Sequence, residues 1–148
     1  MNRILSSKLI ILFARFVVGG IFLYASFDKI ANPGAFARSI ENYHMLPFGL
    51  ENMVAIILPW IEFFVGLALI FGFLIDGAAL ISMGMMMFFI IAITSAILRG
   101  YNIDCGCGLR EGEIVGISRL IEDAGYLFLS WAIYRRKNTS FEIGNVSV

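Results

Sequence analysis

Apolar residues are grouped in four long runs along the chain, and polar residues gather in the stretches between them. The runs cover residues 9–27, 53–75, 77–98 and 114–134, and each is close to the about 20 residues that a helix needs to cross a bilayer. None of them alternates apolar and polar residues as a strand of a membrane barrel does. Because a backbone inside a bilayer has to satisfy its own hydrogen bonds, the runs predict helices. We therefore predict an all-α fold, an integral membrane four-helix bundle.

The segments between the runs differ in length. The first link leaves room for a short surface helix around residues 35–43. Asp76 and Gly77 predict a tight turn, which would make the second and third runs an antiparallel hairpin. The last link, residues 99–113, is rich in glycine. With no internal repeat, residues 1–148 are expected to form a single membrane domain.

Composition supports a membrane protein and excludes other classes. Of 148 residues, 59% are apolar and 15% are charged, whereas soluble domains average about 45–50% and about 25%. The 11 basic and 11 acidic residues cancel, so the chain has no net charge that would attract nucleic acid. We therefore expect contact with the lipid bilayer and no nucleic acid partner.

Basic residues near the helix ends set the expected orientation of the chain. Four spans place both tails and the short turn on one side, together with Arg3, Lys8, Arg135, Arg136 and Lys137. The opposite side has fewer basic residues, namely Lys29, Arg38, Arg99 and Arg110. Because the basic triplet at 135–137 directly follows the last run, we expect a multi-pass protein of the inner (plasma) membrane. Both termini are then cytoplasmic, and the loop at 99–113 faces the periplasm or cell exterior.

This loop contains the two cysteines of the chain, Cys105 and Cys107, separated by one glycine. A disulfide that closes so small a ring adds little stability, and it is easily opened by an attacking thiolate. The pair therefore suits redox exchange in an oxidising compartment. Two alternatives stay open, packing of two small residues in a turn and a soft-metal site. Two thiolates are too few for a metal without further ligands, so we predict no metal.

Ionisable residues inside the predicted spans are the second candidate site: Arg15, Glu62, Arg119, Glu122 and Asp123. A charge at the centre of a membrane helix costs about 2.5–3.5 kcal/mol on insertion scales, so we expect these residues to face the bundle interior and to pair. Arg119 and Asp123 can pair on one helix face. Glu62 and Asp123 share a depth of about 13 Å below the outer helix ends. Two interpretations of these charges stay open. They form a functional site, or their pairs only hold the helices together while Arg15 snorkels to the inner surface.

Several of these residues together resemble the DoxX-like family of membrane proteins. The shared features are an arginine, Gly19 and Gly20 in the first helix, Lys29 after it, Glu62 and Gly66 in the second, and Arg119 with Asp123 in the fourth. The loop Asp104-Cys105-Gly106-Cys107 resembles the MauE branch, the methylamine utilisation membrane proteins, although Gly108 stands where an aromatic residue is frequent. The resemblance implies a four-helix inner-membrane protein linked to maturation of disulfide-rich periplasmic enzymes or to quinone-coupled sulfur oxidation.

The cysteine pair and the resemblance lead to a hypothesis for the function. The chain would be a thiol–disulfide relay for a thioredoxin-like periplasmic protein or a disulfide-rich client, such as a periplasmic amine dehydrogenase during maturation. One of Cys105 and Cys107 attacks, the other resolves, and Arg119 favours the thiolate. With one thiol pair, electrons pass to a second protein or to a membrane carrier, for which a quinone is the candidate cofactor. Two other classes stay open, a non-enzymatic membrane subunit of a redox complex and a small-molecule carrier that uses the buried charges.

Overall fold

The computed structural model describes residues 8–47, 49–100 and 116–135, and these residues form helices and no strand. The helices are α1 (Lys8–Ala31), α2 (Pro33–Asn42), α3 (Leu50–Phe71), α4 (Ile75–Leu98) and α5 (Ile117–Tyr134). The prediction of an all-α fold is confirmed. The short helix predicted in the first link is confirmed as α2, which begins at Pro33 behind the capping residue Asn32.

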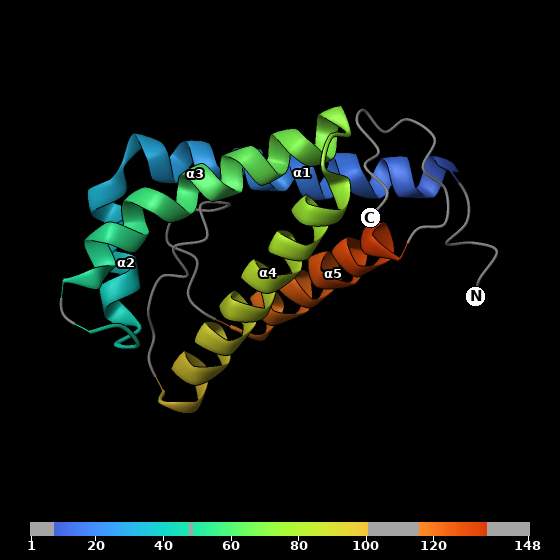
Figure 1. Cartoon of the computed structure of the whole chain (residues 1–148). Coiled ribbons are helices and arrows are strands. Elements are labelled where there is room, and N and C mark those ends of the chain that lie inside the picture. Colours follow the sequence, from blue (N-terminus) through green and yellow to red (C-terminus); the bar gives the residue numbers. More distant parts are fainter. Residues whose placement is uncertain (1–7, 48, 101–115, 136–148) are drawn as a thin grey trace.

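The long helices form two pairs that cross at an angle (Figure 1). α1 packs along α3, and α4 packs along α5. The start of α1, the α3–α4 turn and the end of α5 lie towards one end of the bundle (Figure 1). The opposite end, here called the α2 end, carries α2, and there Tyr43 packs near Ile97 of α4 and Leu120 of α5. The orientation of these two ends relative to the cytoplasm stays a prediction.

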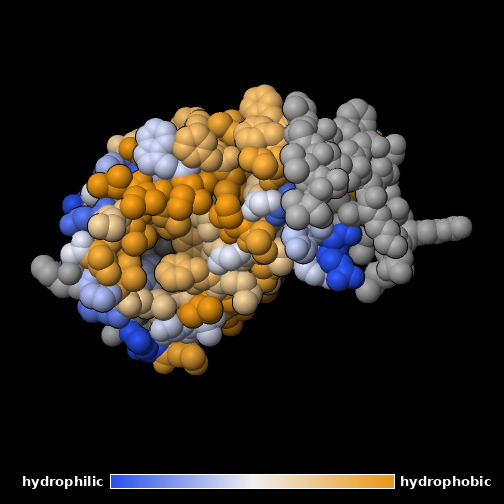
Figure 2. Space-filling model, in the orientation of Figure 1, coloured by the Kyte–Doolittle hydropathy of each residue, from blue (hydrophilic) through white to orange (hydrophobic). Residues whose placement is uncertain are grey.

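Three of the described helices are long and apolar enough to cross a membrane: Leu9–Ala31, Leu50–Phe71 and Ile75–Leu98. Large apolar side chains such as Phe13 and Phe64 are exposed on their outer faces, and Figure 2 shows a largely hydrophobic surface. Such a surface suits lipid, so the chain is a membrane protein. α5 is shorter and carries charged residues in its first half, and it is not among these three helices. The fourth span therefore stays a prediction.

The turn between α3 and α4 lies earlier in the chain than the sequence pattern predicted. α3 ends at Phe71 because Gly72 follows with φ of 83°, a left-handed conformation that glycine adopts readily at the end of a helix. Asp76 and Gly77 lie in the first turn of α4, where a carboxylate interacts favourably with the helix dipole. The prediction of a turn at Asp76 and Gly77 is wrong.

The backbones of α1 and α3 approach closely where two glycines face each other. A Cβ atom added to Gly19 would lie 2.9 Å from the carbonyl oxygen of Gly66, and one added to Gly66 would lie 2.8 Å from that of Gly19. Small residues at such crossings let membrane helices pack without a gap. This contact joins the middle of α1 to the second half of α3, about one helical turn along α3 from Glu62.

Candidate functional site

A buried ion pair joins α1 to α3 near the α2 end. Lys29 Nζ lies 2.6 Å from Glu62 Oε1, and both side chains are 3% exposed. The Lys29 ammonium also lies 5.0 Å from the ring centroid of Phe36 and 5.3 Å from that of Phe89. Aromatic faces attract cations at such distances. Lys29 is thus held by one carboxylate and two rings in a site from which bulk water is excluded.

A second set of charges lies at the start of α5. The guanidinium of Arg119 is buried and forms an ion pair with Glu122, which is 39% exposed. Asp123 follows on the same helix and is buried. Burial raises the pKa of the Tyr43 phenol to about 12, with the Asp123 carboxylate adding to the rise and Arg119 opposing it. The end of α2 therefore lies close to the α5 charges.

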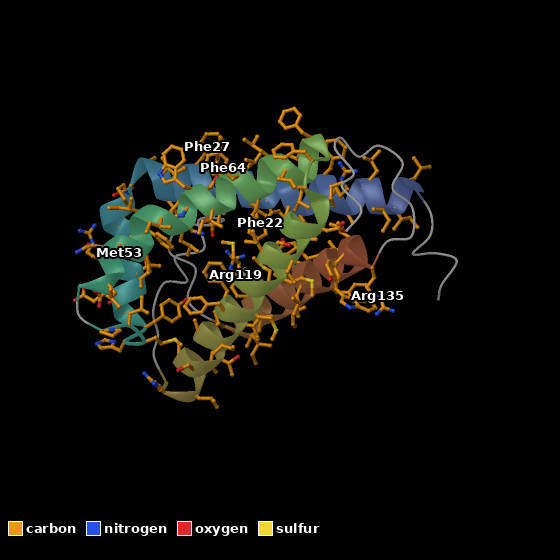
Figure 3. The ribbon with its side chains drawn as sticks, viewed as in Figure 1. Phe22, Phe27, Met53, Phe64, Arg119 and Arg135 are labelled. Atoms are coloured by element: carbon orange, nitrogen blue, oxygen red, sulfur yellow. The ribbon has the colours of Figure 1, made fainter. Side chains whose placement is uncertain are left out.

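The two sets of charges meet at a small cavity inside the bundle. It has a volume of about 30 Å³, and its polar lining comes from Lys29, Glu62, Asp123 and Tyr126. Glu62 and Asp123, which the sequence put at one depth, both line this cavity. Figure 3 shows Arg119 and Phe22 in the bundle interior, whereas Arg135 lies at the far end of α5.

Two carboxylate oxygens in this region have incomplete hydrogen bonding. Glu62 Oε2 and Asp123 Oδ2 are buried, and neither accepts a hydrogen bond from the part of the chain that the structure describes. Most buried polar atoms in proteins have a partner, and the cavity has room for a water-sized group. The cavity therefore offers acceptors for a hydrogen-bond donor.

Arg15 does not belong to this cluster. It is buried in α1, and its Nε donates a hydrogen bond of 2.9 Å to the carbonyl oxygen of Leu69. Leu69 lies in the last turn of α3, where carbonyls lack helical partners and a cation is favourable. Along α1, Arg15 lies about 21 Å from Lys29. The predicted cluster is thus divided, and Arg15 ties α1 to the far end of α3 instead of snorkelling.

The predicted redox residues Cys105 and Cys107 lie outside the described residues. The helices that flank their loop end at Leu98 and begin at Ile117. Both of these points lie towards the α2 end (Figure 1). The described residues contain no group of three or more His, Cys, Asp or Glu side chains that could hold a metal ion.

Lys29 is a partner of Glu62 that the sequence pattern did not predict. The pattern put Glu62 at the depth of Asp123 and allowed Arg119 to pair with Asp123, whereas Glu62 pairs with Lys29 and Arg119 forms an ion pair with Glu122. Lys29 had been counted with the external basic residues, because the first apolar run was ended at residue 27. α1 continues to Ala31, which puts Lys29 inside the bundle. The apolar residues after Asp28 and the acceptor at Glu62 were the available signals.

Comparison with known proteins places the chain in a family. The profile of the family "Methylamine utilisation protein MauE" matches residues 7–135. The chain is 31% identical over 111 residues to the methylamine utilization protein MauE of Methylophilus methylotrophus, covering 74% of this chain and 58% of the relative. It is 30% identical over 95 residues to the MauE of Paracoccus denitrificans, covering 62% of this chain and 51% of the relative.

These matches cover a little more than half the length of each curated relative, and no solved structure matches. The family profile nevertheless covers every helix that the structure describes. The family that the sequence resembled is thereby confirmed. The chain belongs to the MauE family of methylamine utilisation proteins.

Proposed function

We propose that this chain is an accessory membrane protein of methylamine utilisation that works as a thiol–disulfide relay. The observation that carries the proposal is the Cys105-Gly106-Cys107 sequence in the link between α4 and α5. A disulfide closing so small a ring is strained and easily opened. The relatives, which are methylamine utilization proteins, support the pathway, and the client is a disulfide-rich periplasmic protein such as an amine dehydrogenase.

The relay passes oxidising equivalents to its client in two thiol–disulfide exchange steps. A thiolate of the client, or of a thioredoxin-like partner, attacks one sulfur of the Cys105–Cys107 disulfide and forms a mixed disulfide. A second client thiol then resolves it, so that the client loses two S–H bonds and gains one S–S bond while the relay becomes a dithiol. Two electrons and two protons must next leave the relay, either to a membrane carrier or to a second protein. Arg119, in the first turn of α5, favours the thiolate through its positive charge.

The relay requires a defined placement in the membrane. We place it in the inner membrane with α5 as the fourth span, both termini in the cytoplasm and the cysteine loop in the periplasm. The support is the basic triplet 135–137 after α5 and the positive-inside rule. It also rests on the arrangement of the described helices, in which the start of α1 and the end of α5 lie towards one end of the bundle (Figure 1).

Trapping of the mixed disulfide tests the proposal. The exchange is reversible, so in Cys105→Ala and in Cys107→Ala the remaining thiolate can attack a disulfide of the partner protein, which forms a mixed disulfide and releases one partner thiolate. No second thiol of the relay can then release the partner, so one of the two variants is expected to accumulate a reductant-sensitive adduct with a periplasmic protein. The double variant should form no adduct and should leave the client's disulfides incomplete. Ser118→Ala, an exposed change at the start of α5, serves as the control. Wild-type levels of client disulfides in the double variant would reject the relay and favour a scaffold.

A small-molecule carrier is the second candidate function, and the buried cavity with Glu62 and Asp123 favours it. A carrier should fail when Glu62→Gln or Asp123→Asn removes a carboxylate while both thiols are intact. A relay should still form its mixed disulfide in these variants. The two measurements together distinguish the candidates.

A further inference from the structure

An apolar groove lies between α3 and α4 on the surface that suits lipid. Its volume is about 350 Å³, and Leu58 of α3 with Gly84, Phe88 and Phe89 of α4 are among its lining residues. Both helices are long and apolar enough to cross a membrane. Figure 2 shows the hydrophobic face over this region, hollowed between the two helices. A molecule dissolved in the bilayer can therefore enter the groove from the side.

Phe89 separates this groove from the charged cavity. Its half-buried ring lines the groove, the charged cavity and a third apolar cavity of about 40 Å³. The Lys29 ammonium lies 5.3 Å from the same ring. Phe89 therefore lies at the boundary between the groove and the site of Lys29 and Glu62. The bundle thus combines a lipid-facing entrance with a buried polar end.

The polar end determines what kind of molecule fits. Lys29 has three N–H donors, and among the described residues Glu62 accepts one of them. Glu62 Oε2 and Asp123 Oδ2 offer acceptors at the same cavity. A phosphate or carboxylate head would be repelled by these two carboxylates. The site therefore favours a ligand with a neutral head group. Such a head group accepts a hydrogen bond from Lys29 and, when it carries hydroxyl groups, donates one to a carboxylate.

We propose that the groove and the Lys29–Glu62 site bind a lipid-soluble quinone, whose apolar tail lies between α3 and α4 while its head displaces the Phe89 ring and reaches Lys29. The redox role of this site rests on the proposed relay. Oxidation of a dithiol breaks two S–H bonds, forms one S–S bond and releases two electrons and two protons, which together convert a quinone to a hydroquinone. A quinone carbonyl accepts from the ammonium, and a hydroquinone hydroxyl donates to Glu62 or Asp123. Both forms therefore find a matching partner.

Photolabelling of the purified full chain tests the site without any turnover. The probe is an azido-benzoquinone with a ten-carbon tail. Gly84→Phe fills the groove, because a Cβ atom at Gly84 meets no other group within 4 Å. Gly77→Phe is the matched control, since that glycine is equally free at the start of α4 and is not among the residues that line the groove. Gly84→Phe should weaken labelling about tenfold, and Gly77→Phe should leave it unchanged.

The polar end is tested by the double variant Lys29→Met with Glu62→Leu, which removes both charges and leaves neither buried alone. Loss of a hydrogen bond to a charged group should weaken probe binding by about tenfold or more. The double variant Cys105→Ser with Cys107→Ser should bind the quinone probe as wild type does. Probe binding therefore tests the site separately from the proposed relay. Labelling unaffected by Gly84→Phe and by the double variant would overturn the proposal. Equal competition by decanol would also overturn it, because the groove would then take any alkyl chain.

Discussion

Removing one member of the Lys29–Glu62 pair should destabilise the bundle much more than removing both. The two charged atoms lie 2.6 Å apart in side chains that are 3% exposed. Loss of one partner of a buried ion pair typically costs about 3–5 kcal/mol, because the other charge stays buried, whereas an apolar replacement of both is often neutral or stabilising. We expect Lys29→Met and Glu62→Leu each to lower the free energy of unfolding by about 3–5 kcal/mol. The double variant should recover most of that loss.

The measurement is a double-mutant cycle on the purified chain in mixed micelles. Unfolding by a denaturing detergent can be followed through the fluorescence of Trp60, which lies beside Glu62 in α3, and of Trp131 in α5. Asp28→Asn is the control, an exposed change next to Lys29 that should alter stability by no more than about 0.5 kcal/mol. If the two single losses simply add in the double variant, the residues are not coupled. The assignment of Lys29 to the site would then be refuted.

Three further predictions follow from other parts of the chain. Gly19→Ala should lower stability by about 1–3 kcal/mol, because the added Cβ atom would lie 2.9 Å from the α3 backbone. Gly20→Ala is the control and should not lower stability, since a Cβ atom there has nothing within 4 Å. Equal effects of the two variants on thermal unfolding would contradict the close packing. The Tyr43 pKa is raised from 10.0 to about 12, so the protonated phenol contributes fully to the free energy of unfolding below pH 10. This contribution is lost as pH rises towards 12. Tyr43→Phe should remove that loss from the stability curve, and parallel curves would count against burial of the phenol. An impermeant maleimide on intact spheroplasts should label Cys105 or Cys107 after mild reduction, and labelling only after lysis would reverse the orientation.

The helical fold could be predicted because the bilayer leaves few choices for an apolar run of this length. The ends of the helices were harder to predict, since local conformation sets them. α3 ends at Gly72, whose φ of 83° stops the helix, although the apolar pattern continues through Ile75. In the same way α1 continues past Phe27 to Ala31, because Lys29 finds a partner inside the bundle in Glu62.

The pairing of the charges could be predicted only in part. Helix depth correctly predicted that Glu62 and Asp123 lie near each other, since depth depends on a count of residues. The choice of partner depends on tertiary packing. Arg119 forms an ion pair with Glu122, three residues away, whereas the sequence pattern named Asp123, four residues away, as its partner. Lys29 reaches Glu62 because the crossing of α1 and α3 at Gly19 brings its helix close.

The energetics of the ion pair bear on why the chain has it. An apolar pair in place of Lys29 and Glu62 would hold α1 against α3 at least as well, and the contact at Gly19 and Gly66 already joins these helices. Stability alone therefore does not account for two buried charges beside an apolar groove. If Lys29→Met with Glu62→Leu folds as well as wild type yet no longer binds the quinone probe, the charges serve recognition and not the fold. If that variant folds and binds normally, the pair is dispensable both for the fold and for binding of the probe, and the proposed quinone site is wrong at its polar end.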